Sequence, residues 1–280
     1  MGRDARLTDP ELELIAPFLS NDGRDAILAL YELFGEIRRS VFSVSDESLA
    51  RVKLSWWRDE IERMLNQQAN HPATRQLASC ADIDRLDTGE LGDALEGLLM
   101  QMEARLYNDD DEMLLHCWRR DAALLVSAAR LAGATSEVAL HAARQYGLAR
   151  GLARQVLHFE TDRRAGRCWI PEPRLKALEI RPETLLKQSP DMATRIALLN
   201  PLADMAEARY QTANDIDLSN QEREFLRPAI LMATSSLYAL AYMRKRKFSD
   251  RPMGYLRRLF FIWRTARREA LHASQNRITP

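Results

Sequence analysis

Two side chains that can bind a metal or move a proton, His158 and Asp162, stand four residues apart at the end of an apolar helical pattern. That spacing places both on one face of a helix. Arginines follow directly, with a glycine that permits a sharp reversal of the chain: Arg163, Arg164, Gly166 and Arg167. Acidic ligands beside clustered arginines suit a diphosphate with its metal ion. The alternative is that His158 and Asp162 form a hydrogen-bonded pair that caps the helix.

Other carboxylates extend the candidate metal site. Glu32 and Glu36 have the same four-residue spacing. If their helix faces His158 and Asp162, the four side chains could together hold a metal ion.

Basic and aromatic residues supply candidates for substrate binding. Arg51 and Arg58 lie seven residues apart on one helix face, from which they could bind a diphosphate. Salt bridges with Glu32, Glu36 or Asp162 are the alternative. For the aromatic candidates, packing in the core is the alternative to stacking on a ligand. The predicted substrate-binding residues are Tyr31, Arg51, Trp57, Arg58, Arg154, Arg163 and Arg167.

The elements that must position these residues are predicted to be helices. Runs of alternating Val, Ile and Thr, which are typical of strands, do not occur. With 46% hydrophobic residues, the 280-residue chain can bury one large helical core. We therefore predict an all-α bundle that forms a single domain over residues 1–280. A central cavity is predicted between the helices that contain Tyr31, Trp57, Met102, Leu125 and Val156.

Caps and helix breakers divide the predicted bundle. A short helix begins near Pro10, the next two carry Tyr31 and Trp57, and polar residues 66–75 are predicted to form a surface connection. Further helices are predicted over residues 90–107, 111–132, 136–159, 191–217, 221–247 and 252–271. Three prolines limit the segment between residues 171 and 191 to a few helical turns.

Three blocks of sequence resemble the squalene and phytoene synthase family. GRCWIP, at residues 166–171, is similar to the signature that closes the family's second aspartate motif. LALYELFGEIRRSVF, at residues 28–42, and RVKLSWWRDEI, at residues 51–61, resemble its "LYAF" and "WWR" helices. With PAILMATSSLYALAYMRKRKF, at residues 228–248, the similarity spans nearly the whole chain. It implies a terpenoid synthase-like helical fold and, for an active member, prenyl diphosphate substrates with Mg²⁺ held by carboxylates.

The chain departs from the family at the metal motifs. The first aspartate motif falls on residues 38–42, where Arg38 and Arg39 stand and no carboxylate remains. In the second motif, His158 takes the place of the first aspartate and Asp162 keeps the second. Two guanidinium groups would repel Mg²⁺. The chain looks closest to a branch that lacks the first aspartates and includes a mitochondrial complex I assembly factor.

The resemblance and these departures together predict a pseudoenzyme. The expected role is that of an accessory or assembly factor that binds an isoprenoid or other lipid, with a protein partner and no certain cofactor. The alternative is a divergent head-to-head prenyltransferase of squalene or phytoene synthase type, with Mg²⁺ as cofactor. In that case Glu32, Glu36, Glu103 and Asp162 would replace the missing aspartates.

Positive charge is concentrated near the C-terminus. Residues 244–268 contain ten Lys or Arg and one acid, although the whole chain has 40 basic and 40 acidic residues. Leu256, Phe260 and Trp263 recur among these arginines at helical spacing, a pattern typical of an amphipathic helix at an anionic membrane surface. A bundle helix with a solvated basic face is the alternative. Nucleic acid is not an expected partner, because no recognised binding module accompanies the charge.

The cysteines and the hydropathy of the chain indicate the cellular compartment in which we expect the protein. Cys80, Cys117 and Cys168 are widely spaced, odd in number and without a CxxC motif, which favours a reducing environment. No signal peptide or membrane-spanning apolar run is visible. We expect a cytoplasmic protein, with peripheral association at the inner face of the membrane.

Overall fold

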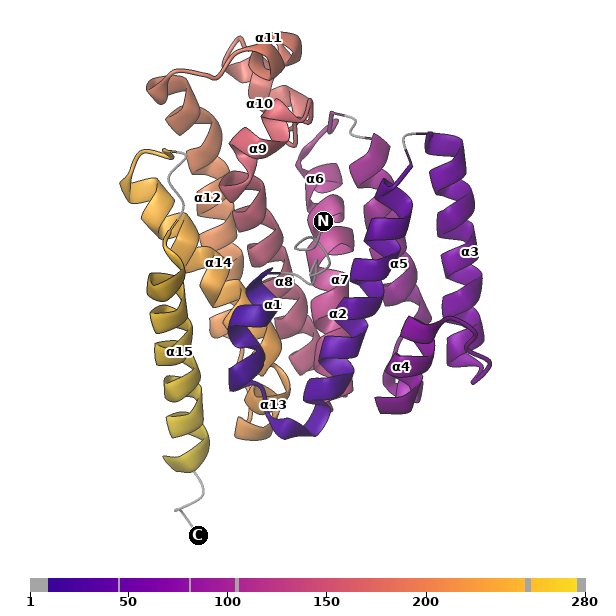
Figure 1. The fold of residues 1–280 in the computed structure, drawn as a ribbon. Coiled ribbons are helices and arrows are strands. Elements are labelled where there is room, and N and C mark those ends of the chain that lie inside the picture. The colour runs from indigo at the N-terminus through magenta and orange to yellow at the C-terminus, as the bar shows by residue number, and fades with distance from the viewer. Residues whose placement is uncertain (1–9, 45, 81, 104–105, 250–252, 276–280) are drawn as a thin grey trace.

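The computed structural model describes residues 10–44, 46–80, 82–103, 106–249 and 253–275, and all regular structure within these ranges is helical (Figure 1). The predicted all-α fold class is therefore confirmed. The helices are α1 (Pro10–Ile15), α2 (Asn21–Phe42), α3 (Glu47–Leu65), α4 (Pro72–Cys80), α5 (Thr88–Glu103), α6 (Asp110–Cys117), α7 (Ala123–Ala132), α8 (Glu137–Leu157), α9 (Phe159–Arg164), α10 (Glu172–Ala177), α11 (Pro182–Lys187), α12 (Met192–Asn214), α13 (Asn220–Phe225), α14 (Arg227–Lys245) and α15 (Tyr255–Gln275). No described helix is both long enough and apolar enough to cross a bilayer.

Helix α8 runs through the middle of the bundle and packs against α7, α12 and α14. Most of its side chains are buried. Two glycines make a close crossing possible. A Cβ at Gly147 would stand 2.4 Å from the Cα of Ala122, and a Cβ at Gly151 would stand 2.8 Å from the Cβ of Cys117. Small residues on α8 thus bring the backbone of residues 117–122 almost into contact with it.

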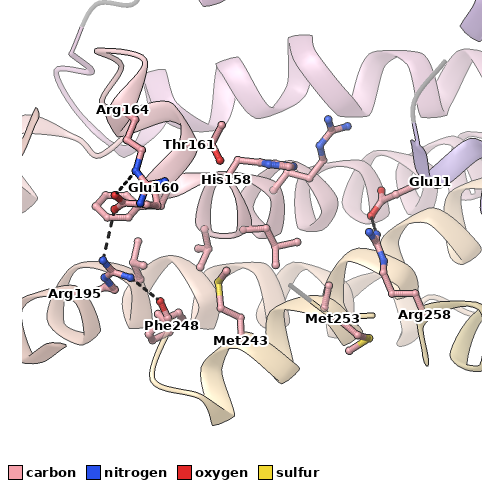
Figure 2. A pocket seen from close by; sticks show the side chains of 16 residues that line it. Glu11, His158, Glu160, Thr161, Arg164, Arg195, Met243, Phe248, Met253 and Arg258 are labelled. Atoms are coloured by element: carbon pink, nitrogen blue, oxygen red, sulfur yellow. Dashed lines mark hydrogen bonds and ion pairs between the residues drawn. The ribbon is translucent and has the colours of Figure 1, made fainter. Parts of the chain in front are cut away.

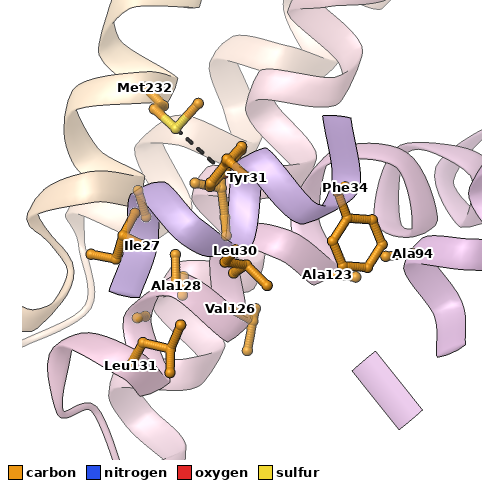
Figure 3. Close-up of a cluster of buried hydrophobic side chains, with 14 of the residues drawn as sticks. Ile27, Leu30, Tyr31, Phe34, Ala94, Ala123, Val126, Ala128, Leu131 and Met232 are labelled. Atoms are coloured by element: carbon orange, nitrogen blue, oxygen red, sulfur yellow. Dashed lines mark hydrogen bonds between the residues drawn. The ribbon is translucent and has the colours of Figure 1, made fainter. Parts of the chain in front are cut away.

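Helix α2 forms one side of the hydrophobic core (Figure 3). Its inward face repeats apolar residues at helical spacing, and Leu30, Leu33 and Ile37 are fully buried. The hydroxyl of Tyr31 donates to the sulfur of Met232 on α14 across 3.5 Å. Tyr31 and Leu125, which were predicted to line a cavity, are packed in this core.

Helix α4 begins inside the segment that was predicted to be a surface connection. Pro72 opens this helix, a position where its missing N–H costs nothing. The buried carboxylate of Glu60 on α3 holds the approach to α4, because it accepts hydrogen bonds from the N–H groups of Asn70 and His71 and from the hydroxyl of Thr74. The polar residues 66–75 therefore gave no sign of α4, because the start of this helix is held by a carboxylate on another helix, that of Glu60.

Two predicted helices are interrupted. The helix predicted over residues 111–132 contains a π-helical turn, Trp118–Ala122, between α6 and α7. Such turns shift the side-chain register and are frequent at functional sites. The helix predicted over residues 221–247 is divided into α13 and α14 at Leu226, just before Pro228.

Candidate ligand-binding site

A cavity of about 350 Å³ lies where α8 meets α9, and it is closed by α12, α14 and the beginning of α15 (Figure 2). Its volume is at the lower end of the range for small-molecule sites. The apolar wall is formed mainly by Val156, Phe159, Leu199, Ala239, Met243, Phe248 and Met253. The charged and polar lining consists of Glu11, Arg154, His158, Glu160, Thr161, Arg164, Arg195 and Arg258. The cavity thus combines a hydrocarbon-like wall with guanidinium groups.

One end of the cavity is organised around Glu160, in the first turn of α9. Its carboxylate accepts from Arg163 at 2.6 Å and from Arg164 at 2.9 Å, and Arg195 of α12 lies 3.5 Å away. The hydrogen bond from Arg163 is the main reason why the pKa of Glu160 is lowered. Arg195 also donates to the carbonyl of Phe248, which ties α12 to the loop after α14.

The other end is organised around Glu11 of α1. This carboxylate accepts from Arg150 at 2.8 Å, from the Ser236 hydroxyl at 2.7 Å and from Arg258 at 2.5 Å. Arg150 is only 2% exposed, so its buried positive charge must be compensated by the carboxylates that it contacts. Its other branch donates to Asp121 at 2.5 Å. Helices α1, α8, α14 and α15 are therefore joined by one buried ionic network.

Asp121, which belongs to the π-helical turn, is the second carboxylate of this network. It also pairs with Arg120 at 2.7 Å and with Arg154 at 3.2 Å. Burial alone would raise the pKa of Asp121, but the surrounding guanidinium groups outweigh burial and lower it. In this buried ionic network, two carboxylates, Glu11 and Asp121, meet four arginines, Arg120, Arg150, Arg154 and Arg258. The cavity borders an excess of positive charge, which favours an anionic ligand.

His158 ends α8 and lines the cavity between its two charged ends. Burial lowers its pKa, and the charges of Arg154 and Arg120 lower it further. The imidazole is therefore neutral at pH 7 and adds no charge to the site. The predicted cap is a backbone contact, because the N–H of Asp162 donates to the carbonyl of His158 at 2.8 Å.

The predicted metal ligands other than His158 are paired with arginines or an amide. Asp162 accepts two hydrogen bonds from Arg167, at 3.0 and 3.2 Å. Glu36 pairs with Arg39, Glu103 pairs with Arg51, and Glu32 accepts from the amide of Gln76. Among the described His, Cys, Asp and Glu side chains, no three gather as a metal site would require. These donors do not fit a resident Mg²⁺ ion.

The predicted substrate-binding residues fall into two groups. Arg51, Trp57 and Arg58 lie on α3, across the bundle from α15 (Figure 1). Arg51 pairs with Glu47 and Glu103, and Arg58 pairs with Glu96 at 2.5 Å. Salt bridges were the alternative for both arginines, although the partners differ from those predicted. Trp57 is buried against His71, with ring centroids 4.7 Å apart.

The second group surrounds the junction of α8 and α9. Arg154 lines the cavity directly, whereas Arg163 and Arg167 fix the carboxylates of Glu160 and Asp162. Residues 166–171 explain the second pairing. Gly166 has a φ of +75°, and this reversal returns Arg167 toward Asp162. The next aromatic residue, Trp169, is buried beside Tyr107 and His116, with ring centroids 5.8 and 4.9 Å away.

Several residues of the site were not predicted from the sequence: Glu11, Arg195 and Arg258 at the cavity, and Asp121 and Arg150 behind it. One local signal existed for Arg150. It stands between Gly147 and Gly151 on a helix whose neighbours are small and apolar, and a cation in such surroundings needs a buried partner. Nothing local identifies Glu11 as that partner, since 139 residues separate the two.

The chain is similar to known proteins both in sequence pattern and in fold. The family model described as squalene/phytoene synthase matches residues 5–259. A crystal structure of a dehydrosqualene synthase in complex with ligand superposes with a TM-score of 0.78 at 15% identity, covering 94% of this chain and 93% of that chain. The squalene synthase HpnC from Alicyclobacillus acidocaldarius gives a TM-score of 0.67 at 13% identity, with coverage of 85% and 89%. No curated protein sequence matches significantly. At these identities the structural similarity establishes the fold alone.

Proposed function

Because the chain belongs to the squalene/phytoene synthase family, we propose that it uses the family's fold to bind a single isoprenoid or other lipid with an anionic head group, without turning it over. The role would be that of an accessory or assembly factor with a protein partner. The cavity between α8, α9, α12, α14 and α15 carries this proposal, because it joins an apolar wall to arginine-rich ends.

The lining supports an anionic amphiphile. Four arginines and two glutamates line the cavity, so a phosphate or diphosphate would meet net positive charge without a metal ion. Arg164 and Arg195 at the α9 end can contribute to a head-group site. Met243, Phe248 and Leu199 offer the hydrocarbon tail a wall that needs no hydrogen bonds. The volume of about 350 Å³ suits one ligand better than two prenyl chains side by side.

The donor arrangement supports a role other than synthesis. Ionising an allylic diphosphate requires Mg²⁺ shared between carboxylates and phosphate. Arg38 and Arg39 stand where the family resemblance places the first aspartates, and Arg167 occupies the carboxylate of Asp162. Both hydrogen bonds from Arg167 go to Oδ1 of Asp162, so a metal ion at this carboxylate would stand beside a guanidinium group.

Two measurements test the proposal. Mass spectrometry of a lipid extract from the purified protein should identify a bound isoprenoid or other lipid. Calorimetry with farnesyl diphosphate in the presence of EDTA should then detect binding. Met243→Trp fills the cavity and should abolish binding, while Arg164→Gln should weaken it several-fold. Arg85→Gln, an exposed arginine that pairs with Asp82 outside the cavity, is the matched control and should leave affinity unchanged.

The opposite outcome is equally specific. Mg²⁺-dependent release of pyrophosphate from farnesyl or geranylgeranyl diphosphate, lost in Asp162→Ala, would identify the chain as a divergent synthase. An extract without lipid, together with no binding of farnesyl diphosphate, would leave the cavity without the proposed role.

A further inference from the structure

Helix α15 presents a row of large apolar side chains to solvent. Tyr255, Leu256, Phe260 and Trp263 have exposed fractions of 64%, 78%, 54% and 43%. They recur at helical spacing and so share the outer side of the helix. A cluster of this kind on a surface indicates a binding face, because isolated exposed apolar residues are ordinary but contiguous ones are not.

The inner side of α15 is firmly attached to the bundle. Ile262 and Ala266 are buried, and the ring of Phe261 stacks on Tyr238 of α14 with centroids 4.2 Å apart. Arg258 turns inward to Glu11 and to the hydroxyl of Ser235. These contacts fix the orientation of the helix, so the outward row is a stable feature of the fold.

Arginines accompany the outward row. Arg257, Arg264, Arg267 and Arg268 are exposed, and residues 253–268 contain no Asp or Glu. Arg267 lies over the ring of Trp263, with its guanidinium carbon 5.5 Å from the centroid. The acid that follows, Glu269, is paired with Arg223. The outer face is therefore apolar and cationic, with no exposed acid among the described side chains of that stretch.

We propose that this outer face of α15 docks on an anionic membrane surface, with the helix lying in the plane of the lipid head groups. The apolar row would enter the boundary of the acyl chains while the arginines contact lipid phosphates. The inference is independent of what occupies the cavity.

An anionic membrane fits the charge and the apolar row of this face better than a second copy of the chain or a nucleic acid would. A second copy docking through the same face would place arginines opposite arginines in a symmetric contact. Nucleic acid would match the arginines but would leave Leu256 and Phe260 without an apolar partner. An anionic bilayer satisfies both parts of the face.

Some of the basic residues in the cationic segment 244–268 are not available to a membrane. Arg244 pairs with Asp204 and Glu207, and Arg258 belongs to the buried ionic network. Arg251 lies outside the described residues. Exposed cations remain at the end of α14, where Lys245, Arg246 and Lys247 stand, and on α15. The exposed arginines of α15 are the ones that accompany the apolar row, and an informative variant must spare Arg258.

The test uses the full chain and vesicles of phosphatidylcholine with or without phosphatidylglycerol. Co-sedimentation should require phosphatidylglycerol and should decline as salt rises. The variant R257E/R264E/R267E should lose more than about tenfold in affinity. R75E/R181E/K187E makes the same charge change at exposed positions elsewhere and should bind like the wild type. Circular dichroism should be the same for all three proteins.

A second pair of variants examines the apolar row. L256S/F260S should also reduce binding, and quenching of tryptophan fluorescence by brominated lipid should disappear in W263F. Failure of the wild type to bind at low salt would overturn the proposal, as would equal loss in the control variant. A dimer that dissociates in L256S/F260S, without vesicle binding, would assign the face to a second copy.

Discussion

Glu60 shows how one buried carboxylate can organise a connection. Its side chain is inaccessible to solvent, and Arg63 lies 2.8 Å away in addition to the three donors near the start of α4. Burial would raise the pKa of this carboxyl, but the hydrogen bonds from His71, Thr74 and Arg63 outweigh it and lower the pKa from 4.5 to about 2. Glu60 therefore stabilises the fold only while it is ionised.

We expect Glu60→Gln to lose about 1.5–3 kcal/mol of unfolding free energy at pH 7, because the amide is a weaker acceptor. The folded-state pKa lies below the unfolded one. The contribution of Glu60 is therefore complete above pH 4.5 and is lost as the pH falls toward 2. Urea unfolding of both proteins across this range should show their stabilities converging. Glu62→Gln, at an exposed position on the same helix, should change little, and a difference independent of pH would contradict this account.

At the scale of one helix, α8 and the π-helical turn depend on the absence of side-chain atoms. A Cβ at Gly147 would meet the Cα and the Cβ of Ala122 at 2.4 and 2.5 Å, so the backbone itself would have to move. The position of Asp121, beside Ala122, depends on the same approach. Packing at this crossing and the ionic network are thus linked.

Gly147→Ala should destabilise the protein by about 1–3 kcal/mol through overpacking. Gly92→Ala on α5 makes the same chemical change where no atom lies within 4 Å of the new methyl group. It should raise stability by up to ~1 kcal/mol, the usual helix preference for alanine. Thermal unfolding of the two variants measures the contrast. Similar midpoints for both would mean that the crossing is looser than described.

Local sequence patterns predicted the long helices and missed what depends on neighbours. Apolar spacing and caps located α2, α3, α5, α8 and α12 closely. The beginning of α4 is held by Glu60 from another helix, and the π-helical turn is fitted against the glycines of α8. Periodicity within a segment carries no information about either contact.

Across the whole molecule, the ionic network joins both ends of the chain to its centre. The buried guanidinium of Arg150 pairs with Glu11 on one side and with Asp121 on the other. Removing either carboxylate would leave this buried positive charge without one of its partners. Such losses are larger than the net worth of the pair, because desolvation is no longer compensated.

We therefore expect Glu11→Ala to cost about 3–5 kcal/mol. Glu13→Ala, at an exposed position on the same helix, should cost much less. Urea unfolding provides the comparison. If both variants lose the same amount, α1 contributes through packing and the network is not the cause.

The family could be inferred from sequence because its motifs are local, whereas the position and the charged lining of the cavity could not. GRCWIP, "LYELF" and "WWR" are short blocks, and the family match confirms what they indicated. The cavity instead depends on contacts such as Arg258 with Glu11 and Arg195 with Glu160, each between residues far apart in the chain. Four of the predicted metal ligands were plausible by spacing and Glu103 by the family resemblance, yet arginines or an amide hold all four carboxylates of the set.

The pairing of Glu11 with Arg258 also has a consequence for how the protein is made. Ser236 and Arg258 are synthesised 225 and 247 residues after Glu11. At typical elongation rates, the last partner is added ~12–50 s after the first. Throughout that interval α1 has no complete docking site, so its apolar face is open to chaperones and proteases. Nascent chains released before Arg258 should therefore be cleaved near the N-terminus, where full-length protein resists.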